Sequence, residues 1–213
     1  MHCPLCYCHS LNLFYRDRRR DYCLCSACGF IFVPRAFHLS ASAERAVYDH
    51  HENNPEDAGY RRFLSRLATP LLERLPAGSK GLDFGCGPGP ALAKMLIEHG
   101  HSVALFDKFY ACDNSVWSQN YDFICATEVL EHLARPRFEV ERLWQQLKPG
   151  GYLGIMTKLA IDKTAFARWH YKNDPSHIGF FSERSVAWLS AYLGARLERV
   201  ATDAFVFVKE VQQ

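Results

Sequence analysis

A glycine-rich segment between two predicted regular elements constrains the fold of this chain more than any other feature. The segment is Gly81-Leu-Asp-Phe-Gly-Cys-Gly-Pro-Gly-Pro90. Its first residues belong to a predicted strand over residues 80–85, and a predicted helix over 91–100 follows it. Gly85, Gly87 and Gly89 permit a tight turn and a close approach of a ligand to the backbone. The free N–H groups at the start of the helix favour an anionic group such as a carboxylate. The segment therefore predicts a ligand-binding turn after a strand.

The next predicted strand, over residues 102–107, ends in an acid. A carboxylate at the position of Asp107 can accept hydrogen bonds from ribose hydroxyls. The glycines follow the pattern Gly-x-Gly-x-Gly, whereas dinucleotide enzymes carry Gly-x-Gly-x-x-Gly. Pro88 also removes an N–H that a pyrophosphate would use. These two differences disfavour NAD and FAD as the cofactor.

Strands and helices alternate through the rest of the chain. Further strands are predicted over 121–127 and 151–157, and helices over 136–147 and 183–193. This alternation predicts an α/β sandwich with a mostly parallel sheet. Two final strands, over 196–201 and 204–209, are joined by only two residues and must form an antiparallel pair. Two helices, over 41–51 and 57–75, are predicted before the glycine-rich segment, the second interrupted or kinked at Pro70.

Taken together, these segments resemble class I S-adenosylmethionine-dependent methyltransferases. Residues 82–89 look like the first motif of that family, and Phe106-Asp107 looks like its second. Residues 121–124 and 128–133 resemble its strand-four region, and 147–151 is similar to the turn before its strand five. Residues 177–182 look like the helix entry that follows. The resemblance covers residues 58–209 and implies a Rossmann-like sandwich, S-adenosylmethionine as cofactor and methyl transfer as activity.

The resemblance also implies where the methyl donor binds. The methionine end would lie at the glycine turn, the ribose at Asp107, and the sulfonium beside Thr127 and Glu128. The full set of expected donor-binding residues is Asp83, Gly85, Gly87, Gly89, Asp107, Lys108, Phe109, Thr127 and Glu128. An alternative role for Glu128 is that of an acid at a helix N-terminus.

One departure from the family pattern concerns the edge of the sheet. Asp107 and Asp122 are only 15 positions apart, where the family core places a helix and a strand. An extended link can cross this gap at about 3.3 Å per residue. We therefore expect the sheet to lack one edge strand, together with the acid that usually contacts the adenine. Phe109, Tyr110 or Asp113 are the candidates to replace that acid.

Six of the nine cysteines lie in the first 28 residues. Cys3 and Cys6 form one Cys-x-x-Cys pair and Cys25 and Cys28 another, a spacing typical of a tetrahedral structural zinc site. Cys8 and Cys23 are competing ligands, and a set of free thiols is the alternative. Short strands are predicted over 11–15 and 21–24. The basic turn between them, residues 16–20, is either a solvated hairpin tip or a contact for RNA.

Three histidines are candidate catalytic bases for an acceptor that starts out protonated. His177 is the leading one, and His132 and His170 are the others, because loops at the carboxyl ends of strands bind ligands in open α/β sheets. Each histidine is also compatible with a structural role in orienting a loop or capping a helix. The helix over 41–51 is either a lid over the donor or a solvated helix.

The net charge and the length of the apolar runs limit the functions that this chain can have. Lys plus Arg number 25 and Asp plus Glu 23, a net charge of +2 that gives no general case for nucleic-acid or membrane binding. No apolar run is long enough to span a membrane, and we expect a cytoplasmic protein.

The expected parts are a zinc-ribbon-like module over 1–34, a helical linker or lid over 35–76, and a donor-binding domain over 77–213. The sequence leaves the oligomeric state open.

Three functions compete on this sequence. The leading one is methyl transfer to a small-molecule acceptor. The second is methylation of RNA or protein, with the cysteine-rich module as the recognition element. The third is binding of S-adenosylmethionine without catalysis.

Overall fold

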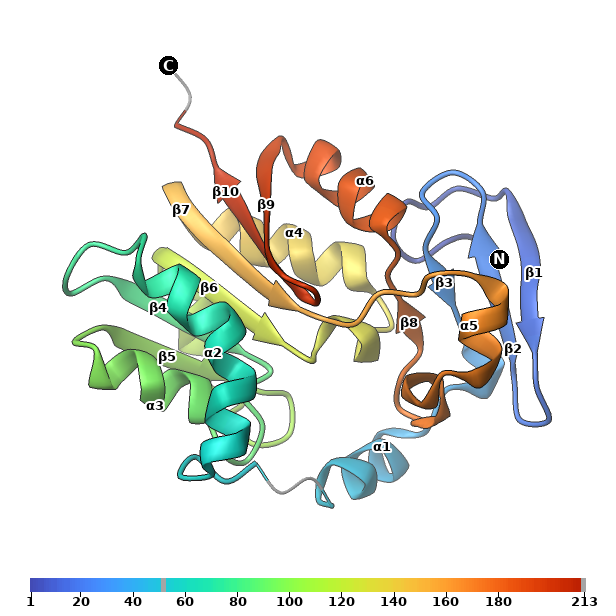
Figure 1. Cartoon of the computed structure of the whole chain (residues 1–213), viewed down its shortest axis with the longest axis horizontal. Coiled ribbons are helices and arrows are strands. Elements are labelled where there is room, and N and C mark those ends of the chain that lie inside the picture. Colours follow the sequence, from blue (N-terminus) through green and yellow to red (C-terminus); the bar gives the residue numbers. More distant parts are fainter. Residues whose placement is uncertain (51–52, 212–213) are drawn as a thin grey trace.

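The computed structural model describes residues 1–50 and 53–211 of this chain. Its centre is a six-stranded sheet in the order β5-β4-β6-β7-β10-β9 (Figure 1). Strands β5, β4, β6 and β7 are parallel, and β10 pairs antiparallel with both β7 and β9. Their bounds are β4 (Lys80–Phe84), β5 (Ser102–Phe106), β6 (Tyr121–Thr127), β7 (Leu147–Met156), β9 (Ala195–Ala201) and β10 (Ala204–Lys209). The expected mostly parallel sheet with an antiparallel hairpin is confirmed.

Helices cover both faces of this sheet. On one face, α2 (Ala58–Leu72) and α3 (Ala91–Glu98) pack over Phe123 and Cys125. On the other, α4 (Pro136–Gln146) and α6 (Glu183–Leu193) pack over the alternate residues, which include Ile124 and Ala126. Because successive strand residues point to opposite faces, each of these strands contributes to both cores. The fold is the three-layer sandwich that the alternation predicts.

The helix termini follow local sequence signals. Asp57 caps α2 by accepting a hydrogen bond from the Tyr60 N–H at 2.6 Å. Ser182 and Ser185 form a reciprocal capping box at the start of α6, and Gly194 ends that helix with φ +61°. Pro70 does not split α2, which continues through it to Leu72. A proline so near the end of a helix disturbs few backbone hydrogen bonds.

The sheet lacks the edge strand beyond β5, as expected. Among the described residues, the link from Asp107 to Tyr121 holds only one short 3-10 turn, Asn114–Ser118. Trp117 of this turn packs edge-on against Phe106 at 4.8 Å between ring centroids, and Arg142 stacks over its other side. An indole therefore covers the apolar side chains of the edge strand.

The cysteine-rich part forms a second, smaller sheet that reaches into the rest of the chain. Its order is β1-β2-β3-β8, with β1 (Leu11–Arg16), β2 (Asp21–Cys25), β3 (Ile31–Phe32) and β8 (Gly179–Phe180). A short helix that sequence patterns did not indicate, α5 (Lys163–Arg168), packs its Phe166 against Tyr22 and Phe180. The expected boundary at residue 34 thus separates β3 from its hydrogen-bonded partner β8.

Helix α1 (Ala41–Tyr48) stands apart from both sheets and buries no residue fully (Figure 1). It ends before the expected limit of residue 51, which lies outside the described residues. It contacts the loop after β5 and, through Tyr48, the ring of His132 after β6. Lys108 pairs with Glu44 at 2.7 Å, and the Tyr110 hydroxyl donates to Asp49 at 2.5 Å. No helix among the described residues has the length and apolar character needed to cross a membrane.

Candidate functional site

A cavity of about 600 Å³ opens where β4, β5 and β6 end. One wall is the glycine turn, and the opposite wall comes from the loops after β6 and α5. Most of the expected site residues line it: Asp83, Gly85, Gly87, Gly89, Asp107, Lys108, Thr127, Glu128, His132 and His177. Phe109 and His170 do not. Phe109 packs on Tyr48 of α1, and His170 is exposed to solvent.

The glycine turn has little room for side chains. Gly85 and Gly87 have φ values of +75° and +63°, which favour glycine. A β-carbon on Gly85 would overlap the side chain of Val129, and one on Gly89 would overlap the backbone carbonyl of Asn53. The bare backbone of this turn therefore faces the cavity directly.

Asp107 is held in place by three backbone N–H groups. Its Oδ2 accepts from Gly87 at 3.1 Å, and its Oδ1 accepts from Phe109 at 2.8 Å and Tyr110 at 3.2 Å. The carboxylate thus joins the glycine turn to the loop after β5. Its position at the carboxyl end of a strand, on the cavity wall, suits a hydrogen-bond acceptor for a diol.

Of two further expected donor-site acids, Asp83 is buried and Glu128 is half-buried. Burial raises the pKa of Asp83, at the end of β4, to about 7. Glu128 follows β6 with φ +53°, a left-handed conformation that strains a residue with a side chain. Burial raises the pKa of Glu128 to about 7 against the opposing charge of Lys158. Its Oε1 has no hydrogen-bond partner among the described residues.

The wall opposite the glycine turn contains a cluster of ionisable groups. Glu131, which sequence reasoning did not select, is fully buried; it accepts hydrogen bonds from the hydroxyls of Tyr171 and Thr157. Burial and the charge of Glu128 raise the pKa of Glu131 to about 8. The next residue, His132, lies 4.6 Å from His177 between ring centroids. Burial lowers the pKa of His132 to about 3, which keeps that ring neutral.

The hydrogen bonds of the two histidines fix their tautomers. His177 Nδ1 lies 2.7 Å from the Tyr171 carbonyl, and His132 Nδ1 lies 3.2 Å from the Ser176 carbonyl. A carbonyl oxygen only accepts, so in each ring Nδ1 carries the proton. When such a ring is neutral, its lone pair lies on Nε2, which can take a proton or bind a metal. His177 Nε2 lies 3.8 Å from Asp174 Oδ2.

Comparison with known proteins places this geometry in a family. A family model described as a methyltransferase domain matches residues 49–200, which include the glycine turn, Asp107 and the cluster on the opposite wall.

This chain belongs to that methyltransferase family.

Solved methyltransferase structures share the fold. The 1,6-didemethyltoxoflavin-N1-methyltransferase of Burkholderia thailandensis is 16% identical, with a TM-score of 0.55 over 94% of this chain and 100% of that one. The sugar N-methyltransferase KedS8 of a Streptoalloteichus species is 15% identical, with a TM-score of 0.53 over 73% and 89%. CalO1, a methyltransferase in calicheamicin biosynthesis, is 13% identical, with a TM-score of 0.50 over 71% and 56%. The chain thus spans just over half of CalO1. No curated protein sequence matches the chain.

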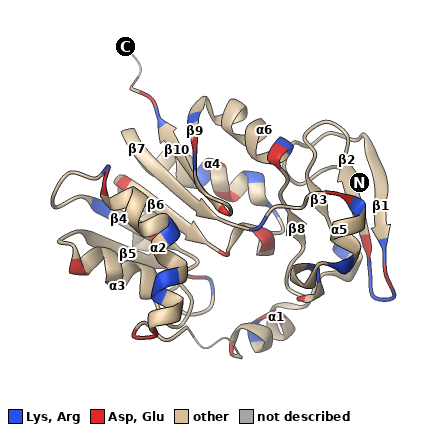
Figure 2. Cartoon of the chain, viewed as in Figure 1, with Lys and Arg blue, Asp and Glu red and all other residues tan. Residues whose placement is uncertain are grey.

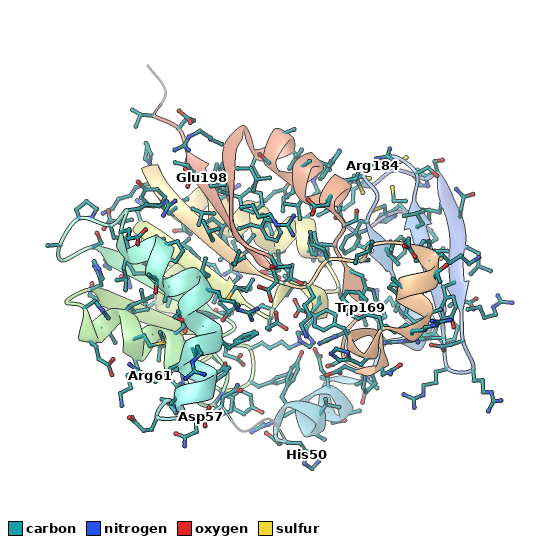
Figure 3. The ribbon with its side chains drawn as sticks, viewed as in Figure 1. His50, Asp57, Arg61, Trp169, Arg184 and Glu198 are labelled. Atoms are coloured by element: carbon teal, nitrogen blue, oxygen red, sulfur yellow. The ribbon has the colours of Figure 1, made fainter. Side chains whose placement is uncertain are left out.

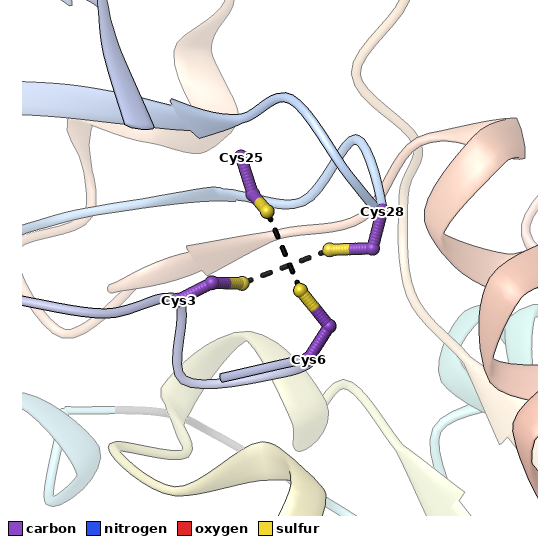
Figure 4. A group of neighbouring side chains, drawn as sticks. All are labelled: Cys3, Cys6, Cys25 and Cys28. Carbon is purple, nitrogen blue, oxygen red and sulfur yellow. Dashed lines mark hydrogen bonds between the residues drawn. The ribbon is translucent and has the colours of Figure 1, made fainter. Parts of the chain in front are cut away.

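The methyltransferase carries its four expected metal-ligating cysteines in one cluster (Figure 4). The Sγ atoms of Cys3 and Cys28 lie 3.6 Å apart and those of Cys6 and Cys25 lie 3.4 Å apart, all four within 4.8 Å of one another. Four sulfurs at about 2.3 Å from one zinc ion would be about 3.8 Å apart. The competing ligand Cys8 is outside the cluster, where its sulfur accepts from the Ser10 N–H. Cys23 is outside it as well.

The two knuckles of this cluster have matching turns. Tyr7 follows the first pair with φ +61°, and Gly29 follows the second with φ +75°. Arg184, at the start of α6, donates to the carbonyls of Ser26 and Ala27 in the second knuckle, and Figure 3 shows it beside the small sheet. Ser182 donates to the Gly29 carbonyl at 2.8 Å. The cluster therefore rests on the methyltransferase sandwich.

The basic turn of the methyltransferase is only in part a solvated tip (Figure 2). Arg18 is exposed, and Arg16 pairs with Asp21. Arg20, however, is buried. Its guanidinium donates to the backbone carbonyls of Lys172, Asp174 and Pro175 at 2.5, 2.8 and 3.2 Å. Both expectations for this arginine, a solvated group and an RNA contact, are therefore wrong, because it anchors the segment that leads to His177.

Proposed function

We propose that this chain transfers a methyl group from S-adenosylmethionine to a small-molecule acceptor. The observation that carries the proposal is one cavity with two different walls. The glycine turn and Asp107 form a wall suited to the donor, and the loops after β6 and α5 bring polar groups to the other. An in-line displacement needs the nucleophile, methyl group and sulfur to be aligned with water excluded.

The size of the cavity supports a small acceptor. Cavities of about 300–1,000 Å³ hold a drug-sized ligand. The donor itself would take a large share of the 600 Å³ here, which leaves room for a small molecule. The Burkholderia thailandensis structure contains 1,6-didemethyltoxoflavin and S-adenosylhomocysteine. Helix α1 places Tyr48 on the cavity wall, and we propose that this helix is the lid.

The donor set proposed here keeps Asp83, Gly85, Gly87, Gly89, Asp107, Lys108, Thr127 and Glu128. Phe109 is retained only as a residue that packs against the lid. His177 and His132 line the cavity on its acceptor side and remain the candidates to handle a proton. His170 is not proposed as a base, because its exposed side chain does not line the cavity.

The four cysteines fit one structural zinc ion, and we propose that they bind it. Four thiolates complete a tetrahedron and leave no position open for a substrate. We also retain the three-part division of the chain at residues 34 and 76, with the β3–β8 pairing as the junction between the first and last parts.

The RNA alternative has less support on this structure. Of the arginines in the basic turn, one is buried and one is paired with an acid, which leaves few charges for phosphate contacts. The alternative of binding without catalysis predicts donor affinity without turnover on any acceptor.

The test is calorimetric titration of the zinc-loaded protein with S-adenosylhomocysteine. We expect saturable binding of one ligand per chain, at least tenfold weaker in Asp107→Ala because the ribose loses its acceptor. Glu98→Gln, an exposed acid on α3, is the matched control and should bind as the wild type does. Absence of heat from a folded protein at high micromolar ligand would refute the proposal. Release of S-adenosylhomocysteine in a panel of small acceptors then tests turnover.

A further inference from the structure

Three side chains at the acceptor wall are arranged like the ligands of a metal ion. Two of them line the cavity and the third is fully buried next to them. Glu131, His132 and His177 each place one ligand atom within 4.8 Å of the other two. Ligand atoms at about 2.0–2.2 Å from one ion lie about 3–4.4 Å apart. The first two residues come from the loop after β6 and the third from the loop before β8. The arrangement thus joins distant segments at one point of the cavity.

The two imidazoles have the tautomer that metal-bound histidines adopt. In each ring the Nδ1–H donates to a backbone carbonyl, that of Ser176 for His132 and that of Tyr171 for His177. Such outer hydrogen bonds fix the ring and direct the Nε2 lone pair toward the ion. Backbone acceptors also hold the rings in this orientation before any ion binds.

The carboxylate has the support that a ligating carboxylate usually has. The hydroxyls of Tyr171 and Thr157 donate to the two oxygens of Glu131, which is fully buried. Each oxygen keeps a second lone pair for an ion. Tyr171 also interacts with Glu128, whose buried Oε1 has no hydrogen-bond partner among the described residues. An orphaned buried carboxylate oxygen beside this cluster is an independent sign that a cationic ligand belongs there.

The charges near the cluster also favour a cation. The carboxyl groups of Glu128 and Glu131 and two imidazoles lie close together at this wall, and Glu131 and His177 are buried. Lys158 is the cationic side chain that approaches Tyr171, with its Nζ 5.2 Å from the ring centre. The positive charges of Lys158 and Arg66 act on Glu128 and offset part of the negative charge of this wall.

We propose that Glu131, His132 and His177 bind one divalent cation, with Glu128 close by. Mixed imidazole and carboxylate donors suit Mn²⁺, Fe²⁺, Co²⁺ or Zn²⁺, whereas Mg²⁺ prefers oxygen donors alone. The cation faces the space where the acceptor of the proposed reaction would bind, and its role there rests on the proposed function.

That role defines the chemical class of the acceptor. A divalent cation binds a hydroxyl oxygen and lowers its pKa, so the acceptor would be an alcohol or a phenol. Its oxygen forms a bond to the methyl carbon while the carbon–sulfur bond of the sulfonium breaks, and the sulfur keeps that electron pair. The hydroxyl proton passes to a cavity carboxylate and then to solvent. In this assignment the histidines hold the cation and do not act as the base.

The test is a titration of the zinc-loaded chain with Mn²⁺, followed by the electron paramagnetic resonance signal of the free ion. Zinc is added at one equivalent per chain, which the four thiolates of the cysteine cluster hold, and any excess is removed, so that the proposed site is the one titrated. We expect one Mn²⁺ per chain, bound at least tenfold more weakly by His132→Asn, His177→Asn and Glu131→Gln. His99→Ala is the matched control, because the Nδ1 of His99 also contacts a backbone carbonyl but lies outside the cavity.

Calorimetry with S-adenosylhomocysteine on the same samples separates the possible failures. A wild-type protein that binds the nucleoside but not Mn²⁺ at millimolar concentration overturns the cation site and leaves the proposed function standing. Mn²⁺ binding without nucleoside binding overturns the proposed function and leaves the cation site standing. Equal Mn²⁺ binding by wild type and all three variants also overturns the site. If a histidine variant does not fold, Thr157→Val, which removes one hydrogen bond to Glu131, should still weaken Mn²⁺ binding.

Discussion

At the scale of single residues, the site is built from groups that sit in unfavourable environments. Glu128 combines a left-handed backbone with a buried carboxylate, and Asp83 is an acid without exposure to water. Strain and buried charge of this kind persist only where the surrounding structure enforces them, and they gather at functional sites. Donor binding or cation binding would relieve part of this cost.

The pKa of Asp83 predicts a pH dependence of stability. The folded-state pKa is about 7, whereas an unfolded aspartate has about 3.9. Between these values the folded state binds more protons, so this group's contribution to stability falls as pH rises from 4 to 7. Asp83→Asn has no such titration. Without added ligand, the Tm of Asp83→Asn minus the Tm of the wild type should therefore increase between pH 5 and pH 8.

The matched control for this measurement is Glu98→Gln. Arg61 holds the pKa of that exposed carboxyl below its usual range, so the wild-type carboxylate is charged throughout the interval. The Tm difference between Glu98→Gln and the wild type should stay constant over the same pH range. A difference between wild type and Asp83→Asn that does not change with pH would contradict the assigned pKa.

At the scale of elements, the small sheet positions one side of the cavity. The guanidinium of Arg20, at the start of the β2 hairpin strand, binds three carbonyls of residues 172–175, and the Tyr22 hydroxyl accepts from the same group at 3.0 Å. This segment leads directly to His177. Strand β8 then pairs with β3, so both ends of the loop are held by the cysteine-rich part. Its role is structural support of the acceptor wall.

Removal of the Arg20 side chain should loosen that wall. Arg20→Ala leaves three carbonyls without their donor, and we expect a loss of about 2–4 kcal/mol in the free energy of unfolding. Arg20→Lys should restore only part of it, because an ammonium cannot reproduce the fork of a guanidinium. Urea denaturation measures the change.

The exposed Arg18 on the same turn provides the control, and Arg18→Ala should stay within about 0.5 kcal/mol of the wild type. Affinity for S-adenosylhomocysteine should hold in Arg20→Ala, since the donor wall is separate, while turnover falls. Unchanged turnover would show that the anchor does not position the acceptor wall.

At the scale of the whole molecule, the two sheets form one connected structure. The contacts are the β3–β8 pairing, the hydrogen bonds of Arg184 and Ser182 to the second knuckle, and the anchor of Arg20. The core that contains Cys3, Cys25 and Cys28 also includes Val186 and Leu189 of α6. The cysteine cluster is thus continuous with the core of the sandwich.

Zinc loss should therefore destabilise the entire chain. We expect about one zinc per purified chain by metal analysis. Cys25→Ser should lose that zinc and lower the Tm of the large sheet as well as that of the small one, in a single transition by far- and near-ultraviolet circular dichroism. Cys8→Ser, outside the cluster, should keep both zinc and Tm. Two separate transitions in the zinc-free protein would contradict the coupling.

The sequence alone predicted the features that depend on short spacing. The glycine turn, the two cysteine pairs and the helix over 183–193 each rest on residues close together in the chain, so local steric and hydrogen-bonding rules are enough to identify them. The missing edge strand was also predictable, because chain length limits what can fit between Asp107 and Asp122. The resemblance to methyltransferases added the Rossmann-like sandwich.

Only the tertiary structure decided how distant segments meet. Sequence could not show that β8 joins the small sheet, that Arg20 is buried 152 residues away from its partner Lys172, or that Glu131 completes a cluster with His132 and His177. Nor could it show that His177 faces the cavity and His170 the solvent. Both histidines lie in the same stretch after the strand over 151–157. The direction of a loop side chain is set by long-range packing rather than by its neighbours in the chain.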